Sequence, residues 1–353
     1  MTTIGYATRR AINWTEQGLV PDGVVRSAIR RLLRARLTEL RADDAEHVAD
    51  ETARFVAEMD QSPIAPLPHK ANEQHYELPA DFFVEVLGPQ RKYSACCWND
   101  GVESLDAAED AALDLTCQRA ELADGQCILE LGCGWGSLTL YMAARYPNAS
   151  ILAVSNSPPQ REFILAEARR RGIANIAVMT RDMNDFDIES RVDRVVSVEM
   201  FEHMRNYRRL FASVSRWLTP RGKFFLHIFV HRCVPYAFVD RDADDWMSRY
   251  FFSGGIMPSA GLPLHFQDHL SLQRQWAWSG NHYARTANAW LSNLDERRAR
   301  VLPILAAAYG HDQAEIWLQR WRIFFMACAE LWGFDQGREW FVSHYLFAPR
   351  ARN

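Results

Sequence analysis

The sequence predicts an α/β fold built around a doubly wound parallel sheet. From residue 126 onward, short apolar runs that suit buried strands alternate with helical stretches. Residues 128–146 have the pattern of a strand, a glycine turn and a helix, and 353 residues are enough to bury a large core. Ligands of such folds bind at the carboxyl ends of the strands, so we expect a site beside the glycine turn.

The expected elements follow one another in regular order. Strands are expected near residues 126–131, 150–154, 175–179, 193–198 and 222–229, and helices near 137–146, 158–171 and 205–218. Pro220 and Gly222 are expected to separate the last of these helices from the fifth strand. Farther along, we expect a strand at about 269–277, helices between about 286 and 333, and a closing strand within WFVSHYLF.

The first hundred residues predict a helical section that covers the site, ahead of a catalytic domain over residues 101–353. An arginine-flanked helix is expected from the apolar stripe of Val25, Ile29, Leu32, Leu33, Leu37 and Leu40. Such a helix can lie on an anionic membrane or dock on its own core, and the second is favoured because no other membrane signal is present. The proline-rich residues 61–70 predict a linker.

Composition and charge argue against several classes of protein. The net charge of −4 gives no general argument for nucleic-acid binding, so a small-molecule partner is expected and a homodimer is left open. No apolar run approaches the roughly 20 residues that span a bilayer. The start, MTTIGYATRR, lacks a secretory apolar stretch, so we expect a cytoplasmic protein without stable membrane insertion.

Cysteine and histidine spacing predicts neither disulfides nor a metal. Seven cysteines without a C-x-x-C pair suit a reducing compartment. His227 and His231 lie four residues apart on an expected strand, about 13 Å at roughly 3.3 Å per residue, which is too far to share an ion.

The turn after the first strand carries Gly132, Gly134 and Gly136 at alternate positions. Glycine lets a ligand approach the main chain, and the helix from about Ser137 offers unpaired amide groups. The spacing matches neither the phosphate-binding loop nor the full dinucleotide pattern. We therefore expect a nucleotide-like cofactor here, the alternative being a tight strand-to-helix turn without a ligand.

The segment of residues 199–203, EMFEH, carries the candidate catalytic groups. If it begins a helical turn, Glu199, Glu202 and His203 share one face, because residues three and four apart are neighbours on a helix. Two carboxylates and an imidazole would then meet just past the fourth strand. The alternative is an acidic helix start with a capping histidine.

Several segments together resemble the cyclopropane fatty acid synthase superfamily, and within it the coclaurine N-methyltransferase branch. They are NEQHYELPADFF, LGPQRKYSACCW, LELGCGWGS, SNSPPQ, VEMFEHMRNY, DDWMSRYFFSGGIMPSA and GNHYARTANAW. The resemblance runs from about residue 70 to residue 353. It implies a class I, Rossmann-like methyltransferase fold, S-adenosylmethionine as cofactor, and a small aromatic or alkaloid-like amine as methyl acceptor.

The resemblance also assigns residues to the cofactor. Matched motif positions imply cofactor contacts by Tyr93, Ser94, Gly132, Gly134, Gly136, Asn156, Gln160, Asp182 and Met183. Many methyltransferases end the second strand with an acid that binds the ribose, whereas this chain has Ser155 and Asn156, whose neutral side chains can make the same hydrogen bonds. Capping a helix is an equally ordinary use of Asp182.

Methyl transfer to nitrogen requires a free lone pair, which an ammonium lacks. Glu199 and Glu202 would bind the cation and His203 would take its proton. Tyr76 and Glu77 resemble substrate-contacting positions of the plant branch. The aromatic insertion at about 232–265 predicts a lid, and the candidates for the lid or pocket, each of which could equally belong to the core, are Trp246, Tyr250, Phe251, Phe252 and Trp332.

Two alternative functions remain open. The fatty-acyl branch methylates an alkene and uses a bound bicarbonate as base, in a cage that resembles Glu202, His227 and Tyr283 here together with a cysteine. This chain has Ala95 at the cysteine position, which argues against cyclopropanation. If the chain methylates an amine, we expect His227 and Tyr283 to contact the substrate and not a bicarbonate. The other alternative is a catalytically inactive binding module, which the intact acidic and histidine cluster disfavours.

Overall fold

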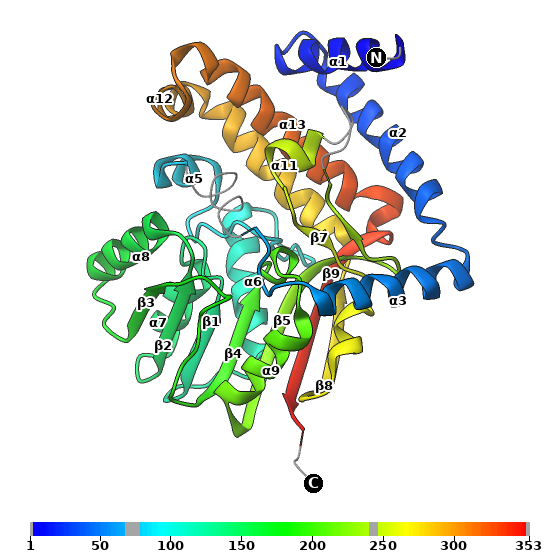
Figure 1. Ribbon diagram of the computed structural model, residues 1–353. Coiled ribbons are helices and arrows are strands. Elements are labelled where there is room, and N and C mark those ends of the chain that lie inside the picture. The colour runs from blue at the N-terminus through cyan, green and yellow to red at the C-terminus, as the bar shows by residue number, and fades with distance from the viewer. Residues whose placement is uncertain (1–2, 68–77, 240–245, 351–353) are drawn as a thin grey trace.

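A computed structural model describes residues 3–67, 78–239 and 246–350 and contains a seven-stranded sheet in the order β3-β2-β1-β4-β5-β9-β8 (Figure 1). The first five strands are parallel, and β9 pairs antiparallel with both β5 and β8. The strands are β1 (Cys127–Leu131), β2 (Ser150–Ser155), β3 (Ile176–Thr180), β4 (Val192–Val198), β5 (Leu218–His231), β8 (Leu270–Trp278) and β9 (Trp340–Pro349).

Helices cover both faces of this sheet, which confirms the doubly wound prediction. Ile128 and Phe225 pack with α6 (Leu105–Arg119) and α7 (Ser137–Arg145). The adjacent residues Leu129 and Phe224 point to the opposite face and pack with α9 (Tyr207–Trp217). This alternation follows from the two-residue period of a strand, and burial on both faces explains the unbroken apolar run of residues 151–154 in β2. The helix α8 (Pro158–Arg171) connects β2 and β3.

A second group of helices lies over the carboxyl ends of the parallel strands, in the upper part of Figure 1. It contains α1 (Thr3–Glu16), α2 (Asp22–Leu40), α5 (Ala80–Val86), α11 (Gly280–Glu296), α12 (Arg298–Tyr309) and α13 (Ala314–Trp332). The helix α3 (Ala45–Gln61) instead contacts α9 and η2 (Leu262–Phe266). The predicted helices are confirmed, with α11 beginning earlier than expected.

The helix α2 docks on the core of its own chain. Val25 is buried, and Ile29 and Leu33 pack against the same apolar cluster, whereas Leu32 is 51% exposed and does not belong to the stripe. Arg26 and Arg30 form ion pairs with Glu330 of α13. Among the described residues, no helix combines the length and hydropathy needed to cross a bilayer.

The start of β5 differs from the prediction. Pro220 and Gly222 lie inside the strand and do not precede it. The register shifts here, because Val192 pairs with Leu218 and Arg194 pairs with Lys223. Such an irregularity accommodates a proline that cannot donate to the ladder.

The aromatic insertion after β5 contains little regular secondary structure. Its described elements are β6 (Tyr236–Ala237), α10 (Trp246–Tyr250), β7 (Ile256–Met257) and η2, and β6 pairs with β7. The short helices η3 (His311–Gln313) and η4 (Phe334–Gly337) flank α13.

Candidate active site

A cavity opens at the carboxyl ends of β1, β2 and β4, where the fold class predicts a ligand. Eight of the nine expected cofactor residues line it, namely Tyr93, Ser94, Gly132, Gly134, Asn156, Gln160, Asp182 and Met183. Glu199 and His203 line the same cavity. The structure therefore brings the glycine turn and part of the acidic segment to one place.

The three glycines of the turn have different structural roles. All have a positive φ, of 78° at Gly132, 51° at Gly134 and 80° at Gly136. A Cβ at Gly134 would meet no heavy atom within 4 Å among the described residues. By contrast, a Cβ at Gly132 would lie 2.5 Å from Met200, and one at Gly136 would lie 2.6 Å from Ile164. Gly136 is outside the cavity lining, so its expected cofactor contact is replaced by close packing against α8.

Several buried polar atoms of the lining have no hydrogen-bond partner among the described residues. They are Nε1 of Trp135, Oγ of Ser137 and Nε2 of Gln160. Gln160 is only 2% exposed, and its Oε1 accepts a hydrogen bond of 2.6 Å from Ser155. Buried polar groups are normally paired, so a lining with three unpaired ones fits a polar ligand.

Asp182 also has a local structural role. Its Oδ1 accepts hydrogen bonds from the backbone N–H and the side-chain amide of Asn184, at 2.8 and 3.0 Å. Asn184 in turn is hydrogen-bonded to the backbone of Ala65. Asp182 therefore stabilises the turn after β3 while it lines the cavity.

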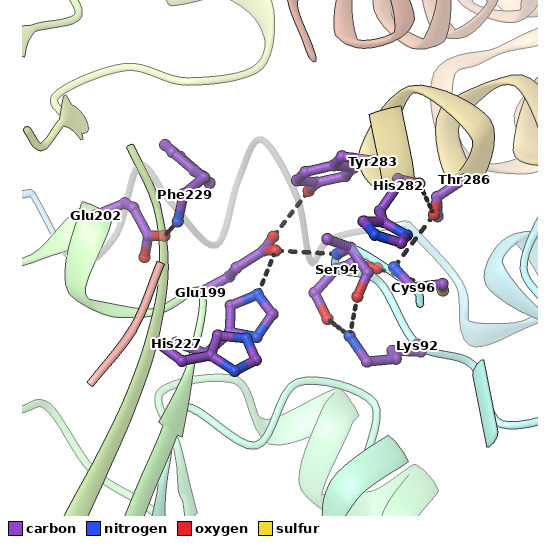
Figure 2. A network of polar contacts seen from close by, with 12 residues as sticks. Lys92, Ser94, Cys96, Glu199, Glu202, His227, Phe229, His282, Tyr283 and Thr286 are labelled. Atoms are coloured by element: carbon purple, nitrogen blue, oxygen red, sulfur yellow. Dashed lines mark hydrogen bonds and ion pairs between the residues drawn. The ribbon is translucent and has the colours of Figure 1, made fainter. Parts of the chain in front are cut away.

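Glu199 lies at the centre of a polar network (Figure 2). Its carboxylate accepts hydrogen bonds from the backbone N–H of Ala95 at 2.9 Å and from the hydroxyl of Tyr283 at 2.8 Å. Nε2 of His227 lies 3.1 Å from the same carboxylate. Because an ionised carboxylate only accepts, the hydrogen of the His227 ring is then on Nε2. The network joins β4, β5, α11 and the segment of residues 92–98.

His227 is fully buried, whereas Glu199 and His203 are partly buried. Burial raises the pKa of Glu199, while the Lys92 ammonium, the Ala95 N–H and the Tyr283 hydroxyl act in the opposite direction. Burial lowers the pKa of His203 to about 4, although the Glu199 carboxylate opposes this shift. At neutral pH, His203 is therefore an uncharged base.

The expectation that Glu199, Glu202 and His203 share a helical face is wrong. The short helix η1 covers only Phe201–His203, and Glu199 precedes it with a φ of 49°. Glu202 is fully buried outside the cavity lining, and its Oε1 accepts a hydrogen bond of 2.8 Å from the backbone N–H of Phe229. The cage of Glu202, His227 and Tyr283 that the resemblance implied is also not found. His227 and Tyr283 are hydrogen-bonded to Glu199 instead.

Most of the aromatic lid candidates pack away from the cavity. Nε1 of Trp246 donates to Glu16, the ring of Tyr250 lies beneath Arg320, and Phe251 stacks on Phe324 with the ring centroids 4.4 Å apart. None of these three candidates lines the cavity, so their expected pocket role is replaced by core packing.

Phe252 and Trp332 lie nearer the candidate catalytic groups. The ring of Phe252 is 4.7 Å from that of His203, and Trp332 stacks on Tyr283 at 4.8 Å. Tyr76 and Glu77 lie outside the described residues.

Comparison with known proteins places this geometry in a family. The sequence profile of mycolic acid cyclopropane synthetases matches residues 67–338. The chain belongs to that family. The (S)-coclaurine N-methyltransferase of Thalictrum flavum subsp. glaucum is 36% identical over 339 residues, which cover 95% of this chain and 94% of that protein. The cyclopropane-fatty-acyl-phospholipid synthase of Escherichia coli (strain K12) is 32% identical over 240 residues, covering 67% of this chain and 59% of that protein.

A solved structure of a family member shows the same fold throughout. Coclaurine N-methyltransferase bound to N-methylheliamine and SAH superposes with a TM-score of 0.93 at 36% identity, covering 97% of this chain and 99% of that chain. The resemblance stated from the sequence motifs is confirmed. Together these matches identify the chain as a methyltransferase of the class I fold.

Sequence reasoning missed the residues that hold the backbone of the segment of residues 88–98 next to the candidate site. Glu109 of α6 accepts hydrogen bonds from the backbone N–H groups of Gly88, Gln90 and Lys92. Thr286 of α11 accepts from the N–H of Cys96 and from the indole of Trp98. These partners are 17 to 190 residues apart in the chain, and no local motif could have found them.

Proposed function

We propose that this chain transfers the methyl group of S-adenosylmethionine to the nitrogen of a small aromatic amine. Its cofactor is S-adenosylmethionine, held by the glycine turn and by the eight cavity residues named above. The names of the coclaurine N-methyltransferase relatives, which match nearly the full chain, support an amine acceptor. The environment of the Glu199 carboxylate is the single structural observation that carries the proposal.

Glu199 fills the position that a bicarbonate would need. Alkene methylation leaves a carbocation that must lose a proton, and the fatty-acyl branch uses a bicarbonate for this step. In this chain, the hydroxyl of Tyr283 and Nε2 of His227 are already bonded to Glu199, and the N–H of Ala95 donates to it as well. The donors of the expected cage are therefore occupied by a carboxylate of the chain itself.

An amine acceptor suits such a built-in carboxylate. The nitrogen lone pair attacks the methyl carbon in line, the S–CH3 bond breaks, and the sulfonium becomes a neutral thioether. A free alkylamine has a pKa of about 10, so removing its proton at pH 7 costs about 4 kcal/mol. Burial lowers the pKa of a bound ammonium as it lowers that of His203, so the uncharged imidazole, which lines the cavity, can take that proton, and Glu199 stabilises the imidazolium that forms.

A methyl-transfer assay with labelled S-adenosylmethionine tests the proposal. A panel of cyclic secondary and tertiary benzylic amines and vesicles of unsaturated phospholipid are offered separately, with and without bicarbonate. We expect label in the amine products in both buffers and no cyclopropane product from lipid. Bicarbonate-dependent label in lipid, without label in any amine, would assign the chain to the fatty-acyl branch.

Replacing Glu199 by glutamine sharpens this test. Glu199→Gln removes the negative charge while keeping the size of the side chain, and we expect turnover to fall about 100-fold, a typical contribution of acid–base and charge stabilisation. Glu189→Gln is the matched control, because Glu189 is exposed outside the cavity. Equal turnover in both variants would contradict a role for Glu199 in catalysis.

We also propose that the protein acts in a reducing compartment, the cytoplasm, on a small molecule and without nucleic acid. All seven cysteines are free thiols, four of them buried, which supports a reducing environment.

A further inference from the structure

Lys92 is a buried lysine beside the Glu199 network (Figure 2). It is one of the residues that line the cavity, although it is only 3% exposed. Nζ donates hydrogen bonds to Oγ of Ser94 at 2.6 Å and to the carbonyl of Ala95 at 2.5 Å. The backbone N–H of Lys92 is held by Glu109. The ammonium is therefore fixed in place by its own loop and by α6.

We propose that Lys92 is a positioning residue that balances the charge of Glu199, so that the acceptor amine, once His203 has taken its proton, is held in the site as its free base. The inference rests on the proposed function and deepens it, because it names the protonation state in which the acceptor is held.

Lys92 and Glu199 hold opposite sides of one residue. Nζ of Lys92 bonds to the carbonyl of Ala95, and the carboxylate of Glu199 bonds to the N–H of Ala95. Ala95 is fully buried, and charges interact more strongly where water is excluded. The Lys92 ammonium and the Glu199 carboxylate are thus separated by the backbone of a single residue. The positive charge of Lys92 therefore acts on the carboxylate of Glu199.

The other titratable groups around Glu199 do not supply a positive charge at neutral pH. Burial lowers the pKa of His203 and of His227, and raises the pKa of Tyr283. Burial also raises the pKa of Glu202 and of Cys328, which favours the uncharged form of each. After burial itself, the Lys92 ammonium has the largest influence on the pKa of Glu199, and it lowers it.

Charge balance resolves a conflict within amine methylation. A lone buried carboxylate would stabilise an ammonium and hold the acceptor in its unreactive form. The sulfonium of the cofactor adds a second positive charge that an uncompensated carboxylate would also bind. With Lys92 beside it, the pair has no net charge, so the acceptor is not held as an ammonium and keeps its lone pair once His203 has taken its proton.

The choice of lysine supports a specific role. Lysine occurs only at positions 70, 92 and 223, whereas lysine and arginine together number 40. A compact ammonium fits between two acceptors of one short loop, while a planar guanidinium with five donors does not have that geometry. A chain that uses arginine almost everywhere else has a lysine at this buried point.

Binding measurements on the full chain test the proposal. The variants are Lys92→Met and Lys92→Arg, with Lys223→Met as control because Lys223 pairs with Glu121 away from the cavity. The first readout is the ratio of the dissociation constants of S-adenosylmethionine and S-adenosylhomocysteine, which differ by one methyl group and one positive charge. Lys92→Met should shift this ratio about tenfold toward the charged sulfonium, as expected for one nearby charge in a buried site.

The second readout uses acceptor analogues in the presence of S-adenosylhomocysteine. The probes are N,N-dimethyl-1,2,3,4-tetrahydroisoquinolinium, which is permanently charged, and isochroman, its neutral oxygen analogue. Lys92→Met should bind the cation about tenfold more tightly and isochroman unchanged. The pH at which kcat for tetrahydroisoquinoline is half-maximal should rise by about one unit, because kcat reports ionisations in the complex with the bound acceptor. Lys92→Arg should restore the binding ratios but not full turnover, and Lys223→Met should match the wild type.

The outcomes separate this inference from the proposed function. Equal weakening of charged and neutral ligands in Lys92→Met, or unchanged ratios with an unchanged pH profile, would overturn charge balancing and leave Lys92 a structural role. If the wild type binds the cofactor but methylates no amine, the proposed function fails. In that case the ratio of the two cofactor forms still tests whether Lys92 balances the charge of Glu199, because this ratio does not depend on the acceptor.

Discussion

Glu199 has a φ of 49°, a left-handed conformation in which side chains other than glycine cost of order 1–3 kcal/mol. Its own N–H donates to the carbonyl of His227, and its carboxylate receives three further donors. These four contacts compensate for the strain and aim the carboxylate into the network. A residue that is strained and yet fully bonded is typical of a functional position.

Gly134 provides a direct test of cofactor binding at the residue scale. In Gly134→Val the added side chain would enter the space beside the glycine turn, so we expect at least a tenfold loss of S-adenosylhomocysteine affinity by calorimetry. Gly172→Val is the matched control, because Gly172 also has a positive φ, of 68°, and open space, but it ends α8 outside the cavity lining. A folded Gly134→Val protein with wild-type affinity would remove the cofactor from this turn.

His203 provides the test of proton removal. His203→Ala should lower turnover at pH 7 by about 100-fold, a typical contribution of a general base. The loss should shrink toward pH 10, where the free amine becomes abundant without help from the protein. The exposed His311→Ala serves as control. A constant loss across this pH range would show that the proton leaves by another route.

At this scale the sequence predicted residue types better than their arrangement. The glycine turn follows from local spacing, and eight of the nine proposed cofactor residues line one cavity. The partners of Glu199 come from residues 95, 227 and 283, which only the tertiary fold brings together. A local helical rule therefore grouped Glu199 with Glu202, although a strand end and a single turn of η1 separate their side chains.

At the scale of elements, α6 and α11 hold the segment of residues 88–98 from two sides. Glu109 binds three of its backbone N–H groups, and a Cβ at Gly88 would lie 2.6 Å from the Glu109 carboxyl. On the other side, Nδ1 of His282 accepts from the N–H of Trp98, and Thr286 accepts from that of Cys96. The same helix carries Tyr283, so α11 positions both the segment and Glu199.

Glu109→Gln should loosen this segment in a pH-dependent manner. The amide can no longer accept the N–H of Gln90, and an unpaired buried donor costs about 1–3 kcal/mol. Burial raises the pKa of Glu109 to about 7, so in the wild type the folded state retains a proton that the unfolded state loses above about 4.5. This contribution to stability is full below pH 4.5 and is lost as the pH rises through 7.

Urea denaturation at pH 5 and pH 8 measures the effect. Glu109→Gln should reduce the free energy of unfolding more at pH 5 than at pH 8, whereas the exposed Glu103→Gln should leave it unchanged at both. A larger loss at pH 8 would reverse the sign and contradict a raised pKa.

The orientation of the aromatic side chains in the expected lid could not be predicted from the sequence. The aromatic residues of the insertion were identified from composition, but composition does not say which way a side chain points. Trp246 and Tyr250 pack toward Glu16 and Arg320, because charged partners on α1 and α13 lie within reach. Phe252 alone of the insertion's four candidates lies against His203.

At the scale of the whole molecule, the alternation of strands and helices predicted the doubly wound sheet and the position of the cavity. The central strands carry short apolar runs, such as residues 151–154 of β2, so local pattern was sufficient. The order β5-β9-β8 was not predicted, because it depends on pairing between segments far apart in the sequence. The division at residue 100 into a helical section and a catalytic domain stays a prediction.

The attachment of α2 to the rest of the molecule can be weakened selectively. Glu330, only 14% exposed in its side chain, pairs with Arg26 at 3.0 Å and with Arg30 at 2.7 Å. Glu330→Gln should lower the free energy of unfolding by about 1 kcal/mol and speed hydrogen exchange in α2, while cofactor affinity stays unchanged. Glu39→Gln, which breaks an exposed pair within α2, is the control. Unchanged exchange in Glu330→Gln would show that apolar packing alone holds the helix.

The insertion of β9 between β5 and β8 has a consequence for how the chain acquires its structure. His344 lies opposite His227 in the antiparallel pair, with the ring centroids 4.5 Å apart. This residue, which packs against the Glu199 network, is therefore synthesised after the residues that form the network. Until residues 340–349 arrive, the edge of β5 has no partner in the sheet. Non-local pairing of this kind is slow to form and leaves an edge exposed to aggregation. During synthesis of this enzyme there is therefore a period in which the residues of the glycine turn have been made but those that complete the surroundings of Glu199 have not. A chaperone would have its largest effect during this period.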